Sequence, residues 1–276
     1  MTLINRLPTR TWNRLGVNET ALSWDENGTT EMSPLTVDVT GRKKVVRVEV
    51  NGENEFSRKK VTINAQSETS VTVIEVLSTE NNLAVETELN VKENALVRLI
   101  QVQRSEEKSL VYNKVTSFCD ESGRVELLQV FPGKGDIYSD SLIELTGDKS
   151  SFKSDIGYLG QREQTVDINL VVNHYGKSTE SEINASGALK DSSSKIFRGT
   201  IDFKTGSSDS VGNEKESVLM LGDGVINKTV PLILCAEENV VGNHGATIGE
   251  LDDETLFYFE SRGIGKAEAE NILARA

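Results

Sequence analysis

The sequence is poor in the residues that several common protein classes require. Its 276 residues include two cysteines, two histidines and four prolines, and aromatic side chains make up 5%. Two cysteines, Cys119 and Cys235, exclude a disulfide framework and predict a reducing compartment. No apolar run approaches the roughly 18 residues of a membrane-spanning helix, and Met1–Leu15 lacks the apolar core of a signal peptide. We therefore expect a cytoplasmic protein without a membrane segment.

Basic charge is also scarce. Lys and Arg number 30 against 43 Asp and Glu, which leaves a formal net charge of -13. Proteins that bind nucleic acid neutralise phosphates with clustered basic side chains, so this composition argues against a nucleic-acid partner. Hydrophobic residues still make up 37% of the chain, which is enough to bury a core.

Short segments rich in Val, Ile, Leu and Thr recur from Lys43 to about Ile248, each bounded by polar turn residues. In Val45–Val50, the valines at 46, 48 and 50 share one face and charged residues share the other, as in a half-buried strand. The same alternation predicts strands at Ser70–Leu77, Ala95–Gln103, Arg124–Phe131, Thr165–His174, Ser217–Leu221 and Val230–Glu237. This region lacks a convincing amphipathic helix, which excludes Rossmann-type winding.

Three all-β architectures fit this pattern: a sandwich, a closed barrel, and a solenoid of stacked short strands. Small and β-branched side chains with few aromatics favour the solenoid, a parallel β-helix with a degenerate repeat. We expect an irregular or partly helical lead-in over 1–40, the β-helix core over 41–248 and a helical segment over 249–276.

The last segment carries the signals of two short helices. Leu251–Gly263 begins with acidic residues and ends with Arg then Gly, and a second helix is expected from Lys266 to Ala276. Ile264, Ile272 and their neighbours supply an apolar stripe. The pair would either cap the open end of the solenoid or dock a partner protein.

Motifs for catalysis and nucleotide binding are absent. The chain has no Gly-x-Ser-x-Gly, phosphate-binding loop, His-Glu-x-x-His or Cys-x-x-Cys sequence, so we expect no enzyme activity of its own. His174 continues the inward face of its strand and favours a hydrogen-bonded structural role. Cys119 favours an inert buried thiol.

Cys235 and His244 are the candidates for chemistry. On a strand continuing to Glu237, Cys235 and Glu237 would share a face about 7 Å apart. His244 follows within Gly242–Thr247, where small neighbours leave its ring unobstructed. Thiolate, imidazole and carboxylate are ligands of iron or zinc, although this spacing alone favours a core cysteine and a surface histidine.

Five segments over residues 195–265 together resemble one protein family. They are Phe197-Arg198-Gly199-Thr200-Ile201, Leu221-Gly222-Asp223-Gly224, Pro231-Leu232-Ile233-Leu234-Cys235-Ala236-Glu237, His244-Gly245-Ala246-Thr247-Ile248-Gly249, and Leu256-Phe257-Tyr258 with Ser261-Arg262-Gly263-Ile264. Their order and spacing are similar to the core of the SufB/SufD family, scaffold proteins of the SUF iron-sulfur cluster assembly system.

The resemblance implies a right-handed parallel β-helix with C-terminal helices that bind SufC, an ABC-type ATPase. It also implies a transient iron-sulfur cluster, a sulfur donor and receiving apoproteins. His244 falls on the histidine implicated in building the nascent cluster. The residues expected to bind SufC are Leu256, Phe257, Phe259, Arg262, Ile264 and Ile272.

Two positions depart from SufB and favour a compact SufD-like member. Gly245 stands where SufB-like members have a glutamate, and Val225 stands where SufB has a cysteine. Since clusters normally take about four protein ligands, one thiol per chain cannot hold one. We therefore expect a homodimer, or a SufB/SufD-type heterodimer, that shares Cys235, His244 or Glu237 near its seam.

Three hypotheses follow for the function. The first is an iron-sulfur scaffold driven by a bound ATPase. The second is a SufD-like structural adapter that binds SufC without ligating iron and keeps Cys235 buried. The third, a carbohydrate-active β-helix, would need two carboxyl groups within roughly 5 to 9.5 Å in a groove and has no support from motifs.

Overall fold

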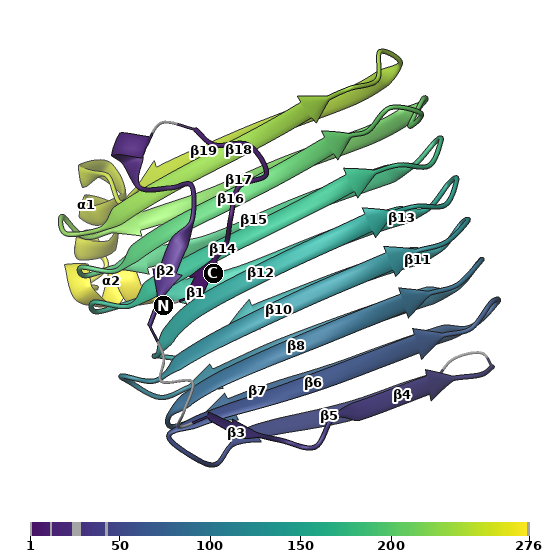
Figure 1. Ribbon diagram of the computed structural model, residues 1–276. Coiled ribbons are helices and arrows are strands. Elements are labelled where there is room, and N and C mark those ends of the chain that lie inside the picture. Colours follow the sequence, from purple (N-terminus) through teal and green to yellow (C-terminus); the bar gives the residue numbers. More distant parts are fainter. Residues whose placement is uncertain (1, 12, 24–28, 42–43, 275–276) are drawn as a thin grey trace.

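The computed structural model describes residues 2–11, 13–23, 29–41 and 44–274. Within these ranges the chain forms a parallel β-solenoid flattened into two sheets (Figure 1). Successive strands alternate between the sheets, so β10 pairs in parallel with β8 on one side and β12 on the other. The predicted all-β solenoid is thus confirmed. No described helix is long and apolar enough to cross a membrane.

The strands divide into two large sheets, called here the B sheet and the C sheet. The B sheet contains β3 (Thr29–Glu31), β4 (Leu35–Val39), β6 (Phe56–Ala65), β8 (Asn82–Val91), β10 (Leu110–Cys119), β12 (Asp136–Leu145), β14 (Thr165–His174), β16 (Ser194–Phe203) and β18 (Ile226–Cys235). The C sheet contains β5 (Lys44–Gly52), β7 (Ser70–Thr79), β9 (Leu96–Ser105), β11 (Arg124–Phe131), β13 (Ser151–Gly160), β15 (Glu180–Lys190), β17 (Ser210–Leu221) and β19 (Val240–Glu250).

The core lies between the two sheets and follows from the two-residue alternation. Along β7, every second residue is buried and the residues between are half-buried. Because neighbouring strands pair in register, inward side chains stack in files along the solenoid. One file in the B sheet runs Ala65, Val91, Cys119, Leu145, His174, Phe203 and Cys235. Turn upon turn, this stacking buries a core of valine, isoleucine and leucine.

The turns also stack. Asn94 and Ser122 take positive φ angles of 55° and 54°. Each donates its backbone N–H to a carbonyl of the next turn, Asn94 to Glu121 at 3.0 Å and Ser122 to Asp148 at 2.9 Å. The tight turns are therefore part of the same ladder as the strands, which keeps the register constant along the solenoid.

The first residues form a small unit on the outer face of the B sheet. β1 (Thr2–Ile4) and β2 (Thr20–Leu22) pair antiparallel, with a 3-10 turn at Asn13–Leu15 between them. Arg198 of β16 is fully buried beneath this unit; it forms an ion pair with Asp167 and donates to the Val17 carbonyl. This buried network fixes the N-terminal unit on the flank of the solenoid.

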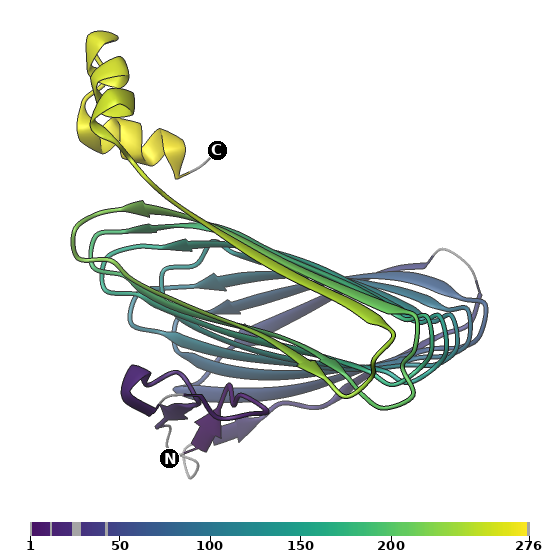
Figure 2. The same cartoon turned by 90° about the horizontal axis from the view of Figure 1, so that it is seen from above.

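Two helices follow the last strand: α1 (Asp253–Ser261) and α2 (Lys266–Leu273). Asp252 caps α1 by accepting from the Thr255 N–H at 2.7 Å, and Gly263 takes a φ of +80°, as the predicted start and stop signals require. The helices lie outside the C sheet, on the opposite side from the N-terminal unit (Figure 2). They leave most of β19 exposed, so they do not cover the last strand of the C sheet.

Candidate functional site

The solenoid ends in an open turn made of β18 and β19. These are the edge strands of the two sheets, so within the described residues each lacks a neighbour on its outer side. Figure 2 looks onto this end. Side chains that would be buried in any earlier turn are accessible here. The inward positions of this turn are Asn227, Thr229, Pro231, Ile233, Cys235, Val240, Gly242, His244, Ala246 and Ile248.

Cys235 is the last residue of β18 and lies in register with the buried Phe203. It continues an inward file, yet its side chain is exposed because no further turn covers it. Its thiol donates a hydrogen bond to the Glu237 carbonyl at 3.5 Å. In contrast, burial raises the pKa of Cys119 to about 12, and this thiol is inert as predicted. The structure therefore separates one accessible thiol from one buried thiol.

Glu237 lies beyond the end of β18, so the alternation that placed it on one strand face with Cys235 does not apply. Its carboxylate accepts from the backbone N–H of Gly206 at 2.9 Å and of Glu238 at 3.1 Å. These bonds hold the pKa of Glu237 below its usual value. Glu237 is half-buried two residues beyond Cys235, and a metal would have to compete with these two N–H donors.

His244 lies on β19 and is exposed. Its register partner on β17 is Glu214, a buried inward residue, so His244 occupies the inward position of the final turn. Gly242 and Ala246 flank it at the next inward positions, as the sequence suggested. The imidazole thus belongs to the open end of the solenoid, as does the Cys235 thiol, but on the opposite sheet.

A buried charged cluster lies directly beneath this end, and sequence reasoning missed it. Lys195 forms an ion pair with Glu216, whose other oxygen accepts from Thr229 at 2.6 Å. Burial lowers the pKa of Lys195, and the Glu216 carboxylate opposes that change. Burial, with Glu216 nearby, raises the pKa of Glu214 to about 7. Charged residues at inward strand positions were the available signal, since a buried charge costs free energy unless it is paired.

His174 has the structural role that the sequence predicted. It is fully buried, and its two ring nitrogens are 2.7 Å from the Thr179 hydroxyl and 2.9 Å from the Ser181 hydroxyl. Burial lowers its pKa to about 4. A neutral, doubly hydrogen-bonded imidazole packed against Phe203 is part of the core.

The candidate ligands do not form a complete metal site within one chain. Among the described residues, no group of three or more His, Cys, Asp and Glu side chains is arranged to hold a metal ion. Cys235 and His244 lie on different strands, and Glu237 is held by backbone donors. One chain therefore presents these potential ligands separately, with Cys235 and His244 both exposed.

The two helices present a second accessible surface. Phe257 is 71% exposed and Ile272 is 43% exposed, and the Arg262 guanidinium lies 5.0 Å from the ring centre of Tyr258. Of the remaining residues predicted to bind a partner, Arg262 is exposed, whereas Leu256, Phe259 and Ile264 are half-buried. Large exposed apolar side chains on a small helical unit are typical of an interaction surface.

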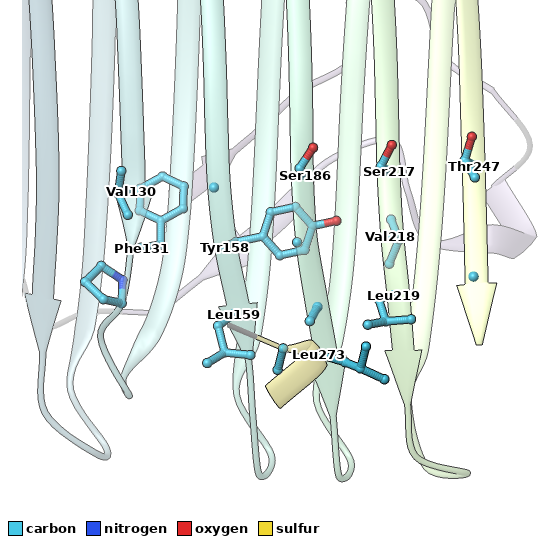
Figure 3. Close-up of a pocket in the computed structure, with 16 residues that line it drawn as sticks. Val130, Phe131, Tyr158, Leu159, Ser186, Ser217, Val218, Leu219, Thr247 and Leu273 are labelled. Atoms are coloured by element: carbon cyan, nitrogen blue, oxygen red, sulfur yellow. The ribbon is translucent and has the colours of Figure 1, made fainter. Parts of the chain in front are cut away.

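An apolar groove of about 680 Å³ lies between α2 and the outer face of the C sheet (Figure 3). Leu273 of α2 lines this groove together with Leu159 and Leu219 of the C sheet. Val130 and Thr247 extend its lining toward either edge of the sheet. The helices thus contact the solenoid loosely on this side, and Lys190 also bonds to Asn271 of α2 at 2.6 Å.

Comparison with known proteins decides the family. Residues 48–276 match the family model described as "SUF system FeS cluster assembly, SufBD core domain". The chain belongs to the SufBD family. This match covers the whole open end and both helices, so the resemblance seen in the sequence is confirmed.

Two curated SufBD relatives illustrate the range of similarity. The iron-sulfur cluster assembly protein SufD of Bacillus subtilis is 34% identical over 139 residues, which cover 50% of this chain and 32% of the relative. A SufBD family protein of Staphylococcus epidermidis is 27% identical over 233 residues, 81% of this chain and 49% of the relative. The chain thus spans about half or less of these relatives' length.

Proposed function

We propose that this SufBD protein is a scaffold on which iron-sulfur clusters are assembled, together with a SufC-type ABC ATPase. The observation that carries this proposal is the open end of the solenoid, which exposes Cys235 and His244 at inward strand positions. A thiol and an imidazole are ligands that iron accepts. The cluster is the cargo of such a scaffold, which itself performs no catalysis.

A dimer supplies the ligands that one chain lacks. Clusters take about four protein ligands, and the described part of one chain gathers no three of them. The unpaired edges of β18 and β19 are a ready template for strand pairing with another chain. A second copy, or a SufB-type partner, placed end to end would bring a second set of Cys235, His244 and Glu237 to the same seam.

The ATPase would dock on the helices. Phe257, Arg262 and Ile272 are exposed there, on helices that lie outside the C sheet and not over the open turn. An ATPase bound at this surface leaves the open end free for dimerisation and cluster assembly. The chain itself has no phosphate-binding loop, so the nucleotide site belongs to the partner.

Anaerobic reconstitution with iron and sulfide tests the ligand assignment. Wild-type protein is expected to gain charge-transfer absorption in the visible range, and Cys235→Ala and His244→Ala are expected to lose most of it. Cys119→Ala is the matched control, because this thiol is buried and should leave the absorption unchanged. Undiminished absorption in Cys235→Ala would overturn the assignment.

Pull-down with a SufC-type ATPase tests the docking surface. The double variant Phe257→Ala/Ile272→Ala should lose binding without loss of fold, because both side chains are exposed. Phe118→Ala, an exposed aromatic on the outer face of β10, is the control and should bind normally. Retention of the ATPase by the double variant would show that docking lies elsewhere.

The second candidate function is a structural adapter that binds the ATPase without ligating iron. The SufD name of the Bacillus subtilis relative and Gly245 next to His244 favour it. The adapter function predicts a buried Cys235, but the Cys235 side chain is exposed in this chain. ATPase binding combined with no cluster in wild-type protein would select this candidate.

A further inference from the structure

Glu214 is an inward-facing carboxylate that the ligand assignment above does not use. It is 5% exposed, and its Oε2 atom has no hydrogen-bond partner. Buried carboxylate oxygens are normally paired, because leaving one unpaired costs free energy. An unpaired buried acceptor beneath an open surface therefore calls for a ligand.

The neighbouring carboxylate does not share this property. Both oxygens of Glu216 have partners: one pairs with Lys195 and the other accepts from Thr229 at 2.6 Å. Glu216 is thus neutralised within the core. Of the two glutamates on β17, Glu214 is the one that retains a free acceptor.

The place of the Glu214 carboxylate is fixed by the opposite sheet. The Glu214 carboxylate reaches across the interior to Gly199 of β16. It occupies the space that the missing side chain of Gly199 leaves, because a Cβ atom added to Gly199 would collide with it. Gly199 is in turn in register with Pro231 of the last turn. The carboxylate therefore lies across the interior, one turn beneath the open end.

His244 is the next inward residue in the file of Glu214. The two are register partners on β19 and β17. Adjacent strands lie about 4.8 Å apart, so their side chains stand next to each other on one face. Imidazole nitrogen and carboxylate oxygen bind a first-row metal at about 2.0 to 2.2 Å, so one ion can bind both where the two groups approach to about 4 Å.

We propose that Glu214 and His244 form a binding site for a divalent metal ion, Fe²⁺ in the assembly reaction, and that this pair captures iron before a cluster is completed. The proposal rests on the proposed function, and it changes the carboxylate that accompanies His244 from Glu237 to Glu214. Glu237 is held by two backbone N–H donors, whereas Glu214 Oε2 has none.

Equilibrium dialysis of the full chain against Fe²⁺ alone, without oxygen or sulfide, tests this pair. Wild-type protein should bind Fe²⁺, and Glu214→Gln and His244→Ala should each bind at least about tenfold more weakly. Glu214→Gln keeps the side-chain shape, and circular dichroism should show an unchanged fold. Glu182→Gln, an exposed outward carboxylate on the same sheet, is the control and should bind as wild type.

The outcomes separate this inference from the proposed function. Equal Fe²⁺ binding by wild type and Glu214→Gln overturns the inference, as does absence of Fe²⁺ binding in a wild type that still forms a cluster when sulfide is added. In both cases the scaffold proposal stands. A wild type that neither binds Fe²⁺ nor forms a cluster overturns both.

Discussion

Protonation of His174 is expected to destabilise the fold in acid. The folded protein holds this imidazole neutral, with a pKa of about 4 against an ordinary value of 6.5, because burial penalises the charged form. Between these two pH values the unfolded chain binds a proton that the folded chain does not. Stability is therefore fully present above pH 6.5 and falls as the pH drops toward 4. At about 1.4 kcal/mol per pKa unit, the loss amounts to about 3 kcal/mol.

Urea denaturation of wild type and His174→Gln at a series of pH values measures this loss. Glutamine does not titrate, so the difference in free energy of unfolding between wild type and variant should shrink by about 3 kcal/mol from pH 7 to pH 4. Phe118→Ala is the control: its side chain is exposed and does not titrate, so the variant should leave the pH dependence unchanged. A constant difference between wild type and His174→Gln across this range would refute the reasoning.

Two further predictions concern the flank and the thiols. Arg198→Ala should lower the free energy of unfolding by about 3 to 5 kcal/mol, because it leaves Asp167 buried without its cation. Urea denaturation of the variant measures this loss. A loss below about 1 kcal/mol would show that the ion pair does not hold the N-terminal unit. In native protein, Cys235 should react with a thiol reagent within minutes and Cys119 only after unfolding. Peptide mass mapping distinguishes the two labelled cysteines. Equal labelling of both would contradict the conclusion that only Cys235 is accessible.

Two-residue alternation predicted the solenoid because inward and outward residues differ wherever one face meets solvent. In β16 the alternation of buried and exposed residues fails twice. Arg198 faces outward yet is buried under the N-terminal unit. Lys195 is charged yet faces inward, where Glu216 pairs with it. Both effects depend on residues far away in the sequence. A strand pattern read from neighbouring residues could not include them.

The candidate site was predicted in part. Cys235 and His244 do lie at one end of the solenoid, because the last strands of a stacked fold are also its last turn. Glu237 was placed on a strand that ends two residues earlier, at Cys235. The pairing of Glu214 with His244 carried no local signal, since it arises from the pairing of β17 with β19 across a full turn.

Cluster content measured together with molecular mass tests the central claim most directly. After anaerobic reconstitution, size-exclusion chromatography with light scattering should show the charge-transfer absorption eluting with a dimer, or with a heterodimer when a SufB-type partner is added. Cys235→Ala and His244→Ala should remove the absorption from that peak. A cluster carried by the monomer would contradict the account, because the ligands would not then be shared between chains.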